Sequence, residues 1–80
     1  MRAGADPESS YTARLLKGHE DKLLKKIGEE ATEVVMAVKD HDQAQIRYEA
    51  ADLIYHLLVV LERENVSLDS LASELEGRRR

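Results

Sequence analysis

Cysteine is absent from this 80-residue chain, and its absence excludes both disulfide bonds and thiolate zinc ligands. Long apolar runs are missing too, because none reaches the roughly 20 residues that would cross a bilayer. The polar N-terminus shows no signal-peptide pattern. A membrane or secreted protein is therefore not expected, and the lack of cysteine fits a cytoplasmic one.

The chain also lacks a strong excess of positive charge. The 16 acidic and 12 basic residues leave a formal net charge of −4, which argues against a nucleic-acid-binding surface. A chain of this size buries only about 60% of the surface that its unfolded form exposes. We expect one domain over residues 1–80, with disordered ends at 1–5 and 77–80, whose stability comes from packing, a metal or a partner subunit.

Helix signals begin near the N-terminus. Asp6 followed by Pro7, the single proline, is typical of a helix start, and Gly18 is typical of a helix end. These residues predict a short helix over about residues 7–17. Apolar residues at three- and four-residue spacing predict a longer helix over about residues 20–39.

The second half of the chain predicts a long helix followed by a short one. Asp42 is a candidate cap for a helix over about residues 43–64, and Asn65 ends it near a left-handed position. Ser67 caps a last short helix over about residues 68–75. The predicted fold class is all-α, an antiparallel helical bundle of two long helices flanked by two short ones.

Gly28 interrupts the first long helix and costs it up to about 1 kcal/mol relative to alanine. Two explanations remain open. Either another helix crosses closely at this position, or the backbone needs clearance beside neighbouring carboxylates.

The segment 50–61 is apolar around nearly the whole helix circumference. A helix of this kind is buried on all sides, and the other helices of so small a chain cannot cover it completely. We therefore expect a second copy of the chain to complete the bundle as a homodimer, or as a higher oligomer.

Two acidic groups interrupt the apolar stretches. Glu29, Glu30 and Glu33 share one helix face, and Glu49 and Asp52 are three residues apart on the next long helix. Antiparallel packing about a turn near residue 41 brings the two groups opposite each other. Carboxylates that converge repel one another, and a hard cation relieves this repulsion. The pattern therefore predicts an oxygen-ligand site of the kind that Mg²⁺ prefers.

The alternative is a solvated acidic face with ordinary salt bridges. Four lysines are available for it, at positions 22, 25, 26 and 39. The metal interpretation is favoured because the second acidic pair lies in a helix with almost no other charge. No thiol is present and no histidine completes a soft site, which argues against zinc and copper. A di-iron site is also disfavoured, because the sequence contains no Glu-x-x-His.

The spacing EExxE followed by ExxD resembles the all-α nucleoside triphosphate pyrophosphohydrolases, the MazG-like superfamily. The resemblance is closer to the phosphoribosyl-ATP pyrophosphohydrolase family and runs from about Asp6 to the C-terminus. Its specific segments are SYT at 10–12, KKIGEEATE at 25–33 and EAADLIYHLLV at 49–59. Members of that family usually carry a further helix before the segment that matches Asp6 and Pro7, whereas only residues 1–5 precede it in this sequence.

The resemblance implies a reaction, the Mg²⁺-dependent hydrolysis of phosphoribosyl-ATP to phosphoribosyl-AMP and pyrophosphate, the second step of histidine biosynthesis. It implies that four acidic residues hold the metal and that Glu29 shares metal binding or orients the attacking water as a base. The implied metal ligands are Glu30, Glu33, Glu49 and Asp52.

Four further residues are candidates for substrate binding. Lys26 either contacts phosphate and stabilises the leaving pyrophosphate, or forms an i,i+4 pair with Glu30. His56 either hydrogen-bonds a carboxylate or is a buried structural histidine. The resemblance implies that Ser10 and Tyr11 line the substrate site.

Two other functions remain open. The same chemistry could act on canonical or damaged nucleoside triphosphates, as in related housecleaning enzymes. The chain could instead be a helical dimerisation module without catalysis, in which case neutralising the acidic residues would change neither metal affinity nor thermal stability.

Overall fold

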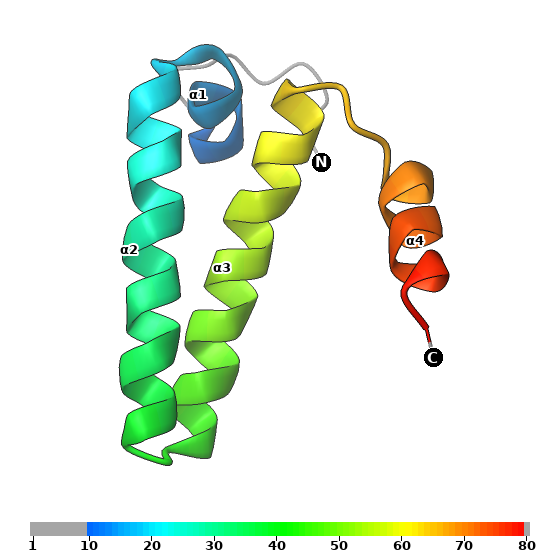
Figure 1. The fold of residues 1–80 in the computed structure, drawn as a ribbon. Coiled ribbons are helices and arrows are strands. Elements are labelled where there is room, and N and C mark those ends of the chain that lie inside the picture. Colours follow the sequence, from blue (N-terminus) through cyan, green and yellow to red (C-terminus); the bar gives the residue numbers. More distant parts are fainter. Residues whose placement is uncertain (1–9, 80) are drawn as a thin grey trace.

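A computed structural model describes residues 10–79, and all the regular structure in that range is helical (Figure 1). The helices in chain order are α1 (Tyr11–Lys17), α2 (Glu20–Lys39), α3 (Gln43–Arg63) and α4 (Leu68–Gly77). The all-α prediction is confirmed. None of these helices is long and apolar enough to cross a membrane.

The two long helices form the body of the fold. Figure 1 shows α2 and α3 side by side and antiparallel, with α1 packed against the end of the pair where α2 begins and α3 ends. The α4 helix lies on the far side of α3 from α2. Three apolar residues are buried, Leu23, Ala37 and Val59. The core of the described chain is therefore thin.

Local capping explains why most predicted boundaries are confirmed. The carboxylate of Asp42 accepts a hydrogen bond from the Gln45 amide, and α3 begins at the next residue, as expected. The Ser67 hydroxyl accepts from the Ser70 amide in the same way before α4. Asn65 has φ 60°, the left-handed conformation predicted for it. The α4 helix runs two residues beyond its predicted end, to Gly77.

The start of the first helix was predicted too early. Ser10 has extended backbone angles (φ −129°, ψ 122°), and its hydroxyl accepts a hydrogen bond from the Ala13 amide at 3.1 Å. Serine satisfies an otherwise unpaired amide of the first turn, so α1 begins at Tyr11. The predicted cap and first residue, Asp6 and Pro7, lie outside the described residues.

Arg63, at the end of α3, holds α1 against α3 through hydrogen bonds. Its Nη1 donates hydrogen bonds to the carbonyl oxygens of Leu15 at 2.7 Å and Gly18 at 2.8 Å. These carbonyls belong to the C-terminal end of α1, where helical partners are missing. The guanidinium thereby satisfies them and ties a short helix to a long one.

Gly18 ends α1 because its backbone approaches the preceding turn closely. A Cβ added here would lie 2.7 Å from the carbonyl oxygen of Arg14, which is backbone and cannot move aside easily. We expect Gly18→Ala to lower stability by about 1–3 kcal/mol through overpacking. Thermal unfolding followed by circular dichroism measures this. Gly77→Ala is the matched control, because no described atom lies within 4 Å of its added Cβ; equal losses would contradict the explanation.

Gly28 has neither of the neighbours that the sequence suggested. Within the described chain, nothing lies within 4 Å of a Cβ added there. Among residues 10–79, no other helix crosses closely at this position, and no carboxylate beyond the adjacent Glu29 lies near it. Gly28 is exposed on α2.

Candidate functional site

The turn between α2 and α3 sets which residues face each other. His41 adopts a left-handed conformation (φ 55°) that reverses the chain. Because the helices are antiparallel, residues at equal distances from this turn lie at the same height. Glu33 and Glu49 are each eight residues from His41, and Glu30 and Asp52 are each eleven residues from it.

One acidic group consists of Glu30, Glu33 and Glu49. Each offers a carboxylate oxygen, and these oxygens lie within 4.8 Å of one another. Glu30 is 2% exposed and Glu49 is 8% exposed. In each of these two buried residues Oε1 has no hydrogen-bond partner among the described residues. A buried carboxylate oxygen without a partner is costly, and a cation placed between such oxygens would satisfy them.

The other oxygen of each buried glutamate has a partner. Glu30 Oε2 lies 3.3 Å from Lys26 Nζ, and Glu49 Oε2 accepts a hydrogen bond from Gln45 Nε2 at 2.8 Å. The hydrogen bond to Glu30 raises the pKa of Lys26, so this ammonium stays charged at neutral pH. In each of these glutamates, Oε2 therefore has a partner and Oε1 has none among the described residues.

Glu33 is exposed at the edge of the group. A hydrogen bond with Glu49, together with the negative charges of Glu30 and Glu49, raises the pKa of the Glu33 carboxyl. This direction is what crowded like charges produce.

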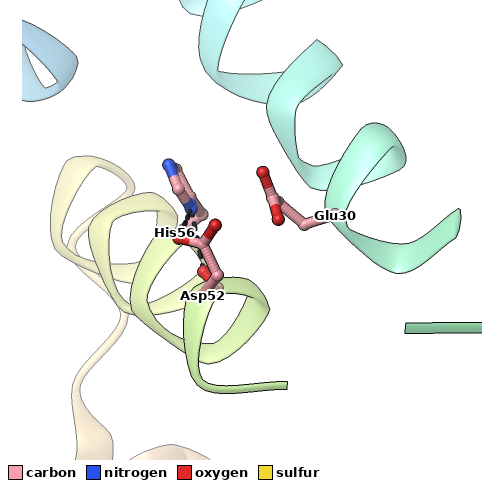
Figure 2. A group of neighbouring side chains, drawn as sticks. All are labelled: Glu30, Asp52 and His56. Atoms are coloured by element: carbon pink, nitrogen blue, oxygen red, sulfur yellow. Dashed lines mark hydrogen bonds and ion pairs between the residues drawn. The ribbon is translucent and has the colours of Figure 1, made fainter. Parts of the chain in front are cut away.

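A second group shares Glu30 with the first. It comprises Glu30, Asp52 and His56, whose candidate ligand atoms also lie within 4.8 Å of one another. Figure 2 shows Glu30 projecting from α2 toward Asp52 and His56, which are one turn apart on α3. Asp52 is about one-third exposed, whereas His56 is buried. Asp52 therefore lies beside Glu30, which both acidic groups share, and His56 lies beside Glu30 as well.

The remaining candidates occupy different places. Tyr11 reaches the second group, because its hydroxyl lies 2.8 Å from His56 Nε2. Ser10 uses its hydroxyl to cap α1. Glu29 is exposed and belongs to neither acidic group within the described chain. Lys26 forms the i,i+4 pair with Glu30 that was one of its two interpretations, at 39% side-chain exposure.

Sequence reasoning did not single out Gln45 or Arg63. Gln45 is four residues before Glu49 on α3, and this i,i+4 spacing was a readable signal for their hydrogen bond. Arg63 bonds to residues 45 and 48 positions away, which no local pattern reveals.

Fold and site together define a class: an all-α protein in which two antiparallel helices gather acidic side chains into groups that could hold a metal ion. The chain belongs to the phosphoribosyl-ATP pyrophosphohydrolase family, whose sequence profile matches residues 1–79. The resemblance inferred from the acidic motifs is confirmed.

Curated relatives agree with this assignment. The chain is 54% identical over 77 residues to the phosphoribosyl-ATP pyrophosphatase of Nitrosomonas eutropha, covering 96% of this chain and 66% of that protein. It is 56% identical over 75 residues to the protein of the same name from Haloquadratum walsbyi, covering 90% of this chain and 74% of the relative.

A longer relative places the same segment beside a second activity. The histidine biosynthesis bifunctional protein HisIE of Halalkalibacterium halodurans is 49% identical over 74 residues, which is 92% of this chain but 35% of that protein. The chain thus spans about two thirds to three quarters of the two single-function relatives above and about one third of the bifunctional one.

Proposed function

We propose that this chain hydrolyses phosphoribosyl-ATP to phosphoribosyl-AMP and pyrophosphate, the histidine-biosynthetic reaction for which its relatives are named, with Mg²⁺ as the cofactor. The observation that carries the metal proposal is the pair of buried, unpartnered oxygens on Glu30 and Glu49. Glu33 lies in one acidic group with both of these residues, and Asp52 lies in the other group with Glu30. Carboxylate oxygens from facing helices fit Mg²⁺, which prefers hard oxygen ligands and keeps open positions for water and phosphate.

The charge of the substrate explains why this chemistry needs a metal. A triphosphate is strongly anionic, and four carboxylates alone would repel it. Glu30, Glu33, Glu49 and Asp52 would hold Mg²⁺, which would supply Lewis-acid polarisation of phosphate oxygens and lower the pKa of water. The bond that breaks joins the α- and β-phosphates, since pyrophosphate leaves.

The other site residues have roles that do not require metal ligation. Lys26 stays protonated beside Glu30, so its ammonium can stabilise negative charge on the departing pyrophosphate. Glu29 lies one residue from Glu30 and is exposed, so its carboxylate remains available to accept a proton from the attacking water. Ser10 is a weaker candidate for substrate contact, because its hydroxyl already caps α1.

The test is release of pyrophosphate from phosphoribosyl-ATP, compared with a panel of deoxynucleoside triphosphates, with and without Mg²⁺. We expect release from phosphoribosyl-ATP to dominate and to require the metal. Preference for a deoxynucleotide would indicate a housecleaning pyrophosphohydrolase instead. Absence of release from every substrate would indicate a non-catalytic helical module.

We further propose that a second copy of the chain completes the fold as a homodimer. Large apolar side chains remain exposed on α2 and α3 although the described core holds only three apolar residues. Along α2, the exposed residues Leu24, Gly28, Ala31 and Val35 recur at helical spacing, and the two small ones allow another helix to approach. Such a crossing would supply the reason for Gly28 that the single chain lacks.

Ile54→Lys should dissociate this dimer. Ile54 is 55% exposed on α3, so one chain tolerates a lysine there, whereas a packed dimer would bury an unpaired ammonium at a cost of several kcal/mol. Light scattering after gel filtration should give the dimer mass for the parent protein and the monomer mass for the variant. Arg47→Gln, at an exposed position of the same helix, should keep the dimer. A monomeric parent, or an unchanged Ile54→Lys dimer, would contradict the proposed interface.

A further inference from the structure

Both ring nitrogens of the buried His56 already have partners. Nε2 lies 2.8 Å from the Tyr11 hydroxyl, and Nδ1 lies 2.8 Å from the backbone carbonyl oxygen of Asp52. Nδ1 also lies 3.5 Å from Oδ1 of the Asp52 carboxylate. The His56 ring is 2% exposed, so water does not compete freely for these contacts.

The chemistry of the partners fixes the hydrogens. A backbone carbonyl can only accept, so Nδ1 of His56 must carry a hydrogen and donate it to Asp52. In the neutral ring, Nε2 is then the acceptor, and the Tyr11 hydroxyl donates to it. If the ring is protonated, Nε2 carries a hydrogen as well. In neither case is a nitrogen lone pair free to bind a cation.

We propose that Tyr11 and His56 are positioning residues for the metal ligand Asp52, and that His56 is not itself a ligand. This inference deepens the proposed function, because it concerns the same carboxylate site. The ring packs beside Asp52 with its Nδ1–H turned to the carbonyl and close to the carboxylate, which restricts a side chain that is about one-third exposed. Side chains that contact a metal ligand in this way orient that ligand in proteins.

Tyr11 completes the arrangement from a separate helix. Its ring lies edge-on to His56, with centroids 5.9 Å apart, and stacks on Tyr55 at 6.2 Å. Tyr11 is the first residue of α1, whose start is fixed by the Ser10 cap and whose end is held to α3 by the Arg63 hydrogen bonds. The resemblance implied that Tyr11 lines the substrate site, and its hydroxyl contacts His56.

The experiment measures Mg²⁺ affinity by calorimetry on the full chain without substrate. His56→Leu removes the donor and should weaken Mg²⁺ binding about 10–100-fold. Tyr11→Phe removes only the hydroxyl, which contacts His56 rather than Asp52 itself. It should cause a smaller loss of Mg²⁺ affinity, of at least about threefold. His56→Asn keeps an N–H near the position of Nδ1 and should restore affinity to within about threefold of the parent.

Tyr55→Phe is the matched control. It removes a phenol hydroxyl from the same aromatic cluster, where the partner is Thr12 rather than His56, and should leave Mg²⁺ affinity unchanged. Circular dichroism checks that each variant folds. If His56→Leu does not fold, the comparison of Tyr11→Phe with Tyr55→Phe still decides the question.

A kinetic readout separates positioning from substrate contact. With saturating Mg²⁺, Tyr11→Phe should leave the KM for phosphoribosyl-ATP unchanged. A raised KM with unaltered Mg²⁺ affinity would overturn the inference and make Tyr11 a substrate contact. A parent protein that binds no Mg²⁺ would instead overturn the proposed metal site, and this inference with it.

Discussion

Replacement of Glu30 by glutamine should lower pyrophosphate release more than about 100-fold, because loss of a ligand exceeds the 10–100-fold effect typical of residues that only orient one. Glu30 belongs to both acidic groups, so its replacement removes a carboxylate from each group at once. The substitution keeps the shape of the side chain and removes its charge. Steady-state assay of pyrophosphate release at saturating Mg²⁺ measures the effect.

The same substitution should not destabilise the metal-free protein. Glu30 is 2% exposed, and its Oε1 is unpartnered beside Glu33 and Glu49, so the charge is unfavourable there without a cation. The lost contact with Lys26, a half-exposed partner, is worth at most about 1 kcal/mol. We expect an unchanged or higher melting temperature without metal, and no further rise with Mg²⁺.

Glu62→Gln is the control, because Glu62 is an exposed carboxylate of α3 outside both acidic groups. It should keep activity and the response to Mg²⁺. Near-parental activity in Glu30→Gln would show that Glu30 is not a metal ligand. A strongly destabilised metal-free variant would instead show that Glu30 serves mainly as a structural ion-pair partner for Lys26.

Helix boundaries were predictable where a local side chain decides them. The caps at Asp42 and Ser67 and the left-handed Asn65 depend on atoms within a few residues, which the sequence displays directly. The start of α1 was not predicted, because Asp6 with Pro7 and Ser10 are both good caps and the sequence does not rank them. The path of α1 across α3 depends on Arg63, which lies 45 residues beyond Gly18.

The acidic residues of the site and the facing of their two groups were predictable, but the contact of Tyr11 with His56 was not. Residue type and helical spacing single out the acidic residues on the two long helices. A turn near residue 41 predicted that the two groups lie opposite each other, and His41 provides this turn with φ 55°. The contact of Tyr11 with His56 spans 45 residues and depends on how α1 docks.

Mg²⁺ should raise the melting temperature of the parent protein by roughly 10 °C or more. Binding to the folded state alone adds about 2.7 kcal/mol at a free Mg²⁺ concentration about 100 times the dissociation constant. About 1 kcal/mol shifts the melting temperature of a domain of this size by roughly 4–8 °C. Unfolding scans across a Mg²⁺ titration measure this shift, and Glu30→Gln should show none. A flat titration of the parent protein up to millimolar Mg²⁺ would contradict the site.

Removal of the metal should also expose a pH dependence that comes from Glu33. Its pKa is raised above the ordinary value of 4.5 by the hydrogen bond with Glu49 and by the charges of Glu49 and Glu30. Between these two pKa values the folded protein holds a proton that the unfolded chain has released. The free energy of unfolding therefore falls as pH rises through this window. The stabilising contribution is fully present below pH 4.5 and is lost above the raised pKa.

Comparison with Glu33→Gln isolates this contribution from other titrating groups. In metal-free buffer, the melting temperature of the parent protein should fall relative to that of Glu33→Gln as pH rises above about 4.5, since glutamine does not titrate. Saturating Mg²⁺ should abolish the decline, because a cation beside Glu33 would offset the negative charges that raise its pKa. Parallel curves for the two proteins without metal would mean that the pKa of Glu33 is not raised in the folded protein.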